Sequence, residues 1–274
     1  MRRQQYGRPV RQRHNMATPW CARRHRVDAD RMQAHYQRKI VDMPPGVLGI
    51  PTSHLGRYRD FEVCFTSLSL PPGSFTAWGQ GSNPTKNMND FIRQLLKVKE
   101  MEWLWIIGDD HVFPPDIIIR LYERGKDIVV PLCTRRTYPY IPTVHNNGHD
   151  SKDYNNWRSV EYEWFRGKSG LVNLNKSDKI VGNAGMLIKK SVFEKMEGPW
   201  FEVGKVDSEY PSPDLWFAKK AVDAGFNLWL DMDNPIGHLT HMGAWPFFDV
   251  EKNEWGAEIR SPNDAWGERG LMVD

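Results

Sequence analysis

The sequence lacks several features that would each assign it to a class of protein. No run of about 18 apolar residues occurs, so we expect no membrane-spanning helix. The three cysteines, Cys21, Cys64 and Cys133, are too widely spaced for a disulfide framework or a zinc pattern, which predicts a reducing, cytoplasmic location. No apolar segment follows the charged N-terminus, which excludes a secretory signal. The loop 79–87 lacks Gly-Lys-Ser/Thr, so it is not a phosphate-binding P-loop.

Basic and acidic residues nearly balance, but their distribution is uneven. The 37 Lys and Arg against 34 Asp and Glu give a net charge of +3, too small to imply a polyanion partner for the whole chain. Eleven basic residues fall within the first 40, where only Asp28 and Asp30 are acidic. We therefore expect residues 1–43 to form a basic, flexible tail. It is either a solvated extension or an electrostatic arm for an anionic partner such as nucleic acid or lipid.

The most informative stretch begins with five apolar residues, Trp103 to Ile107, which predict a buried strand. Gly108 ends this strand, and Asp109, Asp110 and His111 follow at once. Side chains in this position lie at the carboxyl edge of a sheet, where α/β proteins bind ligands. Two carboxylates with one imidazole favour Mn²⁺ or Mg²⁺. The alternative is an Asp-rich turn after a core strand, without a bound metal.

Strand and helix patterns alternate along most of the chain, which predicts an α/β fold with a mostly parallel, Rossmann-like sheet flanked by helices. Residues 138–180 are polar and turn-rich, and Ser159–Phe165 alternates with period two, so we expect an antiparallel insertion there. The predicted organisation is a basic tail at 1–43, a main α/β domain at 44–241 and a Trp-rich C-terminal lid or wrap at 242–274. The strands are expected at 47–52, 75–78, 103–107, 127–132 and 226–230, and helices at 61–70, 88–98 and 213–224.

Further candidate residues follow the later strands. Arg135 and Arg136 come after the strand at 127–132 and should reach the same sheet edge as the Asp-Asp-His turn. The turn Gly182–Gly185 lets backbone approach a ligand closely. His238 follows the strand at 226–230, as a metal ligand or as an ordinary surface histidine.

The clearest helix signal begins at Ser212, an expected N-cap, with Pro213 at the first helical position and Gly225 at the end. Asp214 therefore lies in the first turn, where the helix dipole favours the ionised carboxylate.

Four blocks in this order resemble the GT-A glycosyltransferases, specifically the small bacterial and phage enzymes of the family-two-like type. They are Gly108–His111, Val181–Phe193 with Pro199–Phe201 after it, Ser212–Ala221, and Gly237–His238. Two positions depart from the family: Gly108 replaces the first residue of an acidic triplet, and Pro213 replaces the usual Glu beside the base. The resemblance covers roughly residues 45–240.

The resemblance implies a GT-A fold and a metal-dependent transfer of sugar from a nucleotide-sugar to an acceptor hydroxyl. Asp109, His111 and His238 would hold Mn²⁺ or Mg²⁺, with Asp110 on the metal or the donor. Asp214 would be the general base of an inverting displacement. The implied donor site also includes Arg135 and Arg136 at the diphosphate, and Gly182, Asn183, Gly185 and Trp216 around the sugar.

The acceptor stays open between a glycan, a lipid, a protein and a modified nucleic acid. Two alternatives from other classes also stay open. A nucleotidyltransferase of similar fold would release pyrophosphate, and an inactive or nucleic-acid-associated relative would depend on the basic tail.

Overall fold

The computed structural model divides the chain into two compact units, Met1–Lys39 and Ile40–Asp274. It describes residues 40, 42–51, 58–136, 140–146, 160, 162–203, 212–240, 243–249 and 254–260, all in the second unit. Except for residues 40, 42 and 43, the predicted basic tail lies outside the described residues.

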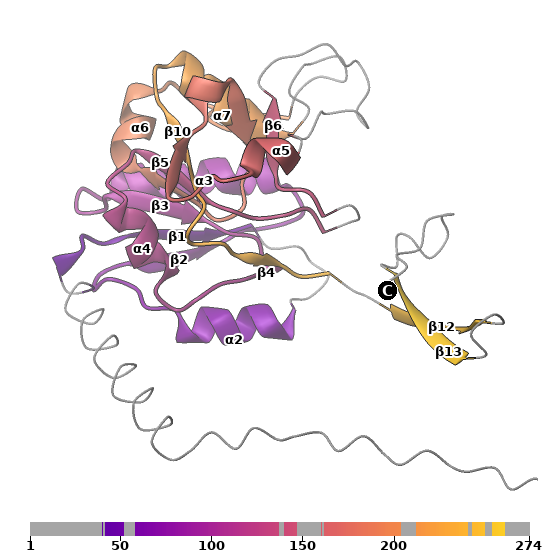
Figure 1. The fold of residues 1–274 in the computed structure, drawn as a ribbon. Helices are drawn as coiled ribbons and strands as arrows, with labels where there is room; N and C mark the ends of the chain where they lie inside the picture. Colours follow the sequence, from indigo (N-terminus) through magenta and orange to yellow (C-terminus); the bar gives the residue numbers. More distant parts are fainter. Residues whose placement is uncertain are drawn as a thin grey trace, which may run out of the picture. The chain divides into compact units, whose positions relative to one another are not determined.

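The second unit is built on a seven-stranded sheet, which confirms the α/β class (Figure 1). Five strands run in one direction and two, β9 and β7, run against them, so the sheet is mostly parallel, as predicted. The order is β2 (Phe75–Trp78), β1 (Gly46–Ile50), β3 (Trp103–Ile106), β9 (Met186–Lys189), β5 (Ile128–Pro131), β10 (Leu228–Asp231) and β7 (Leu171–Asn173).

Strand β9 sits between β3 and β5 and is antiparallel to both. Its amino end therefore lies at the sheet edge where β3 and β5 have their carboxyl ends. The turn Gly182–Gly185, which precedes β9, meets this edge. There the Trp105 indole donates a 2.8 Å hydrogen bond to the carbonyl of Gly185. One antiparallel strand thus brings the glycine turn to the same edge as the Asp-Asp-His turn.

Helices cover both faces of the sheet (Figure 1). Alternate strand residues such as Val47 and Leu104 join a buried cluster with α3 (Pro84–Lys97), α6 (Lys190–Lys195) and α7 (Pro213–Asp223). On the opposite face lie α2 (Arg59–Ser67) and α4 (Ile117–Glu123). Phe113, which precedes α4, packs edge-on against both Trp105 of β3 and Phe61 of α2. Among the described residues, none of the helices is long and apolar enough to cross a membrane.

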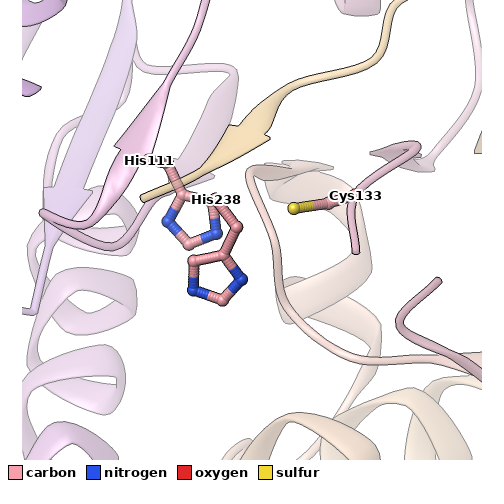
Figure 2. A group of neighbouring side chains, drawn as sticks. All are labelled: His111, Cys133 and His238. Carbon is pink, nitrogen blue, oxygen red and sulfur yellow. The ribbon is translucent and has the colours of Figure 1, made fainter. Parts of the chain in front are cut away.

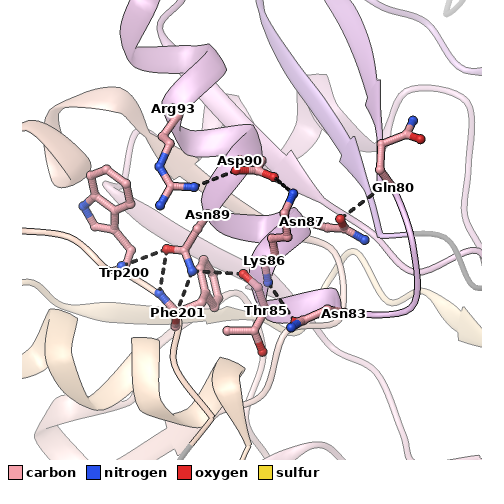
Figure 3. Close-up of polar contacts among 10 residues, drawn as sticks. All are labelled: Gln80, Asn83, Thr85, Lys86, Asn87, Asn89, Asp90, Arg93, Trp200 and Phe201. Carbon is pink, nitrogen blue, oxygen red and sulfur yellow. Dashed lines mark hydrogen bonds and ion pairs between the residues drawn. The ribbon is translucent and has the colours of Figure 1, made fainter.

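Helix α3 starts at Pro84, earlier than the predicted residue 88. The Asn83 side chain accepts a 3.0 Å hydrogen bond from the backbone N–H of Lys86, and Pro84 fills the first helical position (Figure 3). The first turn of the helix is polar and comes before the apolar residues that recur with the helical period. The prediction, which rested on those apolar residues, therefore began the helix too late. Asn87 then accepts from the N–H of Gln80, which ties the loop after β2 to the helix.

The predicted antiparallel insertion is present in part, since β6 (Val144–Asn146) pairs antiparallel with β8 (Lys179–Val181). The strand expected at Ser159–Phe165 is wrong where it is described, because Tyr162–Phe165 forms a short helix, α5. The helix has four residues, which is about one turn. In so short a segment, the alternation of apolar and polar residues expected in a strand cannot be distinguished from the 3.6-residue period of a helix. The short 3₁₀ helix η2 (Asn175–Ser177) precedes β8.

Within the predicted C-terminal lid, the described residues form a hairpin of β12 (Gly243–Asp249) and β13 (Glu254–Arg260). The rest of 242–274 lies outside the described residues, and its role as a lid stays a prediction.

Candidate metal and catalytic site

Two histidines from distant parts of the chain meet at the carboxyl edge of the sheet. His111 opens the short strand β4 (His111–Val112) just after β3, and His238 closes β11 (Gly237–His238) after β10. The two strands pair antiparallel with His238 directly opposite His111. Their rings stack with centroids 4.3 Å apart and planes 15° from parallel. These two predicted site residues are thus brought together.

The Asp110 carboxylate lies against both imidazoles. Its Oδ1 is 2.9 Å from His111 Nδ1, and its Oδ2 is 3.2 Å from His238 Nε2 and 3.0 Å from an Arg136 guanidinium nitrogen. The Asp110 carbonyl accepts a 2.7 Å hydrogen bond from the N–H of Leu239, which fixes the segment after β11. Asp109 is half-buried next to this carboxylate. Its predicted role as a metal ligand stays a prediction.

Glycine at position 108 is explained by this arrangement. A Cβ built there would lie 2.6 Å from Asp110 Oδ1 and 3.0 Å from His111 Nδ1. A side chain of any kind would therefore displace the carboxylate from the histidine. The departure from the acidic triplet leaves space for Asp110 to contact His111.

A third candidate ligand, Cys133, was missed in the sequence. It lies two residues after β5, at the same edge, and is buried. Ligand atoms of His111, Cys133 and His238 all lie within 4.8 Å of one another. Figure 2 shows the thiol directed toward the two rings. The sequence does show that Cys133 follows a buried strand, as metal ligands at a sheet edge do. The wide spacing of the cysteines, however, matches no metal-binding motif.

The charges of the cluster are strongly coupled. Burial alone would raise the pKa of Asp110, but hydrogen bonds from His111 and His238 hold it well below its ordinary value. Burial likewise opposes protonation of His238, yet contacts with Asp110, Cys133 and the Thr134 carbonyl raise its pKa to about 9. Burial would raise the pKa of the Cys133 thiol, whereas the two histidines lower it to about 7. The cluster therefore stabilises a thiolate and a carboxylate beside positive charge.

The predicted base, Asp214, lies in the first turn of α7, against the glycine turn. Its Oδ2 accepts a 2.9 Å hydrogen bond from the backbone N–H of Asn183. A Cβ at Gly182 would come within 2.7 Å of the same oxygen, so glycine lets the carboxylate approach the turn. Ser212 occupies the N-cap position, but its side chain makes no capping hydrogen bond.

A short chain of contacts links Asp214 to the histidine cluster. The N–H of Gly182 donates to the carbonyl of Thr143, and the N–H of Thr143 donates to the carbonyl of Cys133, both at 3.0 Å. His145, two residues from Thr143, is buried within the electrostatic reach of Asp214 and Arg135. Burial, reinforced by Arg135 and opposed by Asp214, lowers the pKa of His145 to about 4.

The remaining predicted donor-site residues occupy different environments. Arg136 is exposed and pairs with Asp110, while burial lowers the pKa of the half-buried Arg135. Gly185 adopts a positive φ of 73°, and a Cβ there would crowd Ile236 and Ile107. Trp216 is half-buried and packs against the hydrophobic core. Its indole Nε1 is buried and has no hydrogen-bond partner within the part of the chain that the structure describes.

The donors in the cluster fit a bound cation, but not the set that the sequence suggested. Mg²⁺ prefers oxygen ligands, whereas the described cluster offers two imidazoles and a thiol beside one carboxylate. Binding of Mn²⁺ or Mg²⁺ therefore stays a prediction, and the nitrogen and sulfur donors of the cluster disfavour Mg²⁺.

Comparisons with known proteins leave the family open. No family model matches the chain. No curated protein matches it either. Among solved structures, the chain is similar to A197 from STIV, at 13% sequence identity and a TM-score of 0.46. The similarity covers 78% of this chain and 93% of that one.

Proposed function

We propose that the protein is a cation-dependent glycosyltransferase of GT-A type that moves a sugar from a nucleotide-sugar to an acceptor hydroxyl. One observation carries the proposal. The His111–His238 pair with Asp110, and the Asp214 carboxylate, lie at one edge of the sheet and are linked through Thr143. This edge is where open α/β sheets bind their ligands.

The donor half of the site rests on the cluster and its arginines. A cation held by His111 and His238 would neutralise the charge that develops on the leaving diphosphate. Arg136, exposed beside Asp110, is positioned to contact a phosphate oxygen. The carboxylate of Asp110 keeps that guanidinium next to the histidines.

The acceptor half rests on Asp214. With Oδ2 held by the N–H of Asn183, Oδ1 makes no hydrogen bond within the described part of the chain. In the proposed step, Oδ1 takes the proton of the acceptor hydroxyl while the hydroxyl oxygen attacks the anomeric carbon. The bond from that carbon to the diphosphate breaks, and the nucleoside diphosphate leaves with the electron pair. One displacement inverts the anomeric centre.

The test begins with thermal-shift measurements of the full chain with UDP-, GDP-, CDP- and dTDP-sugars, each with Zn²⁺, Mn²⁺ or neither. We expect one nucleotide class to stabilise the protein in a cation-dependent way. That donor is then used to measure release of nucleoside diphosphate with candidate acceptors. Release of pyrophosphate from a nucleoside triphosphate would indicate nucleotidyl transfer instead.

Asp214→Asn should lower turnover by at least about 100-fold, because it removes the proton acceptor and keeps the shape. Asp223→Asn is the matched control, since Asp223 lies at the other end of the same helix. Equal turnover of Asp214→Asn and Asp223→Asn would exclude Asp214 as the base. No stabilisation by any donor in a folded chain would overturn the proposed function.

A further inference from the structure

We infer that His111, Cys133 and His238 form a zinc-type site in which the Cys133 thiolate is a metal ligand. The inference does not depend on sugar transfer. It assigns a soft transition-metal site where the sequence pattern suggested a carboxylate-bound Mn²⁺ or Mg²⁺.

The first support is the convergence of three ligands from three separate segments. His111 follows β3, Cys133 follows β5 and His238 follows β10, yet their ligand atoms lie within 4.8 Å of one another (Figure 2). Ligand atoms around a tetrahedral zinc ion are about 3.3–3.8 Å apart, given bonds of about 2.0–2.3 Å. Small side-chain rotations would close the remaining difference.

The second support is the orientation of the imidazoles. His238 Nδ1 is 2.8 Å from the carbonyl of Thr134, and His111 Nδ1 is 3.2 Å from the carbonyl of Gly108. Metal-bound histidines characteristically donate one ring N–H to a carbonyl or carboxylate, which leaves the other nitrogen for the metal. His111 therefore keeps Nε2 for a metal, while His238 Nε2 contacts Asp110 Oδ2 in the metal-free chain.

The third support is the environment of these Nε2 atoms. Among the described residues, His111 Nε2 is buried and has no hydrogen-bond partner, an arrangement that is costly unless something binds there. His238 Nε2 faces Asp110 Oδ2 at 3.2 Å. A cation bound at this nitrogen would replace the proton that links it to Asp110.

Asp110 acts as a positioning residue that orients the imidazole of His111. Its Oδ1 lies 2.9 Å from His111 Nδ1, the carboxylate–histidine contact typical of the outer shell of zinc sites. The protein supplies three ligands, and a fourth position stays open for water or substrate, as in catalytic zinc sites. On binding, the Cys133 thiol gives up its proton to solvent and the thiolate bonds to the metal.

The experiment uses the full chain, stripped with a chelator and then titrated with Zn²⁺, Co²⁺ or Mn²⁺ alone. We expect one Zn²⁺ per chain, bound at least about 100-fold more tightly than Mn²⁺. The Co²⁺ form should show the intense near-ultraviolet charge-transfer band of a thiolate–cobalt bond. This band reports the ligand directly and needs no enzymatic assay.

Variants assign the band and the affinity. Cys133→Ser should abolish the band, whereas the double variant Cys21→Ser/Cys64→Ser should keep it, because only Cys133 remains as a thiol. Asp110→Asn keeps all three ligands and should weaken Zn²⁺ binding by about 10–100-fold. Circular dichroism of each apo variant establishes that the fold is intact.

The inference is overturned if the folded wild-type chain binds no Zn²⁺, if it prefers Mn²⁺, or if Cys133→Ser keeps the cobalt band. Its failure is distinguishable from failure of the proposed function. Sugar transfer with Mn²⁺ in a chain that rejects Zn²⁺ would overturn only the zinc site. A stoichiometric zinc site in a chain that binds no nucleotide-sugar would overturn only the glycosyltransferase.

Discussion

At the scale of single residues, His145 is a buried base whose environment disfavours its charge. Its pKa is about 4 in the folded chain, against about 6.5 for an unfolded histidine. Between these values the unfolded state binds the extra proton, so the stability of the fold rises with pH across this interval. The contribution is complete above pH 6.5 and is lost as the pH falls toward 4.

We predict that this group alone removes about 3 kcal/mol of unfolding free energy between pH 6.5 and pH 4. Urea unfolding of the wild type and of His145→Gln at several pH values measures it. The variant lacks the titrating group, so its stability should fall less steeply with acid. Parallel curves for the two proteins would show that His145 is not the group responsible.

Several site residues were predictable from their chemistry and their place after a strand. His111 and His238 each follow an apolar run, and a parallel sheet collects such positions at one edge. Cys133 was not predictable in the same way, because a lone cysteine far from both histidines in sequence has no recognisable spacing. The need for glycine at position 108 likewise depends on where Asp110 points, which only the three-dimensional structure shows.

At the scale of elements, Asn89 of α3 holds a buried turn in place (Figure 3). Its Oδ1 accepts from the backbone N–H groups of Trp200 and Phe201, at 2.9 and 3.2 Å. Its Nδ2 donates to the carbonyls of Phe201 and Thr85, at 2.7 and 2.9 Å. One side chain thus satisfies four backbone groups and joins the segment after α6 to α3.

Asn89→Ala should lower the unfolding free energy by at least about 2 kcal/mol, because it leaves buried N–H and C=O groups unpaired. The urea midpoint measures the loss. Asn83→Ala is the matched control, since it removes one exposed capping bond on the same helix and should cost about 1 kcal/mol. Equal losses in the two variants would contradict the anchoring role of Asn89.

Most elements were predictable where the apolar period was long enough. The strands β1, β2, β3 and β5 lie within a residue or two of their expected positions, because buried runs of parallel sheets are distinctive. The antiparallel direction of β9 was not predictable, since its four residues Met186–Lys189 give the same pattern either way. That direction is what brings the glycine turn to the site.

At the scale of the whole molecule, charge and core belong to different parts of the chain. The buried apolar side chains of the described residues run from Met43 to Ile236. Residues 1–39 form a separate unit and carry eleven basic residues against two acidic ones. The rest of the chain has 26 basic and 32 acidic residues, so its net charge is negative.

Deletion of residues 1–39 should therefore leave the thermal midpoint unchanged and abolish retention on a heparin column at low salt. Differential scanning calorimetry and a salt gradient measure the two effects. A deletion of residues 261–274, which carry one arginine, Arg269, serves as the control for truncation itself and should keep the retention. A marked fall in the midpoint after the first deletion would mean that the tail contributes to folding.

The position of β9 between β3 and β5 has a consequence for synthesis of the chain. Among the described strands, β5 pairs with β9 and β10 alone, both encoded later, so residues 128–131 emerge from the ribosome before their partners in the sheet. The early strands β2, β1 and β3 can form a three-stranded sheet, but the far edge of β3 stays open until residues 186–189 arrive. Nascent chains of intermediate length therefore expose the backbone edge of Trp103–Ile106 to other chains. Strand β9 therefore has two effects: it brings the glycine turn to the candidate site, and its synthesis covers the exposed edge of β3.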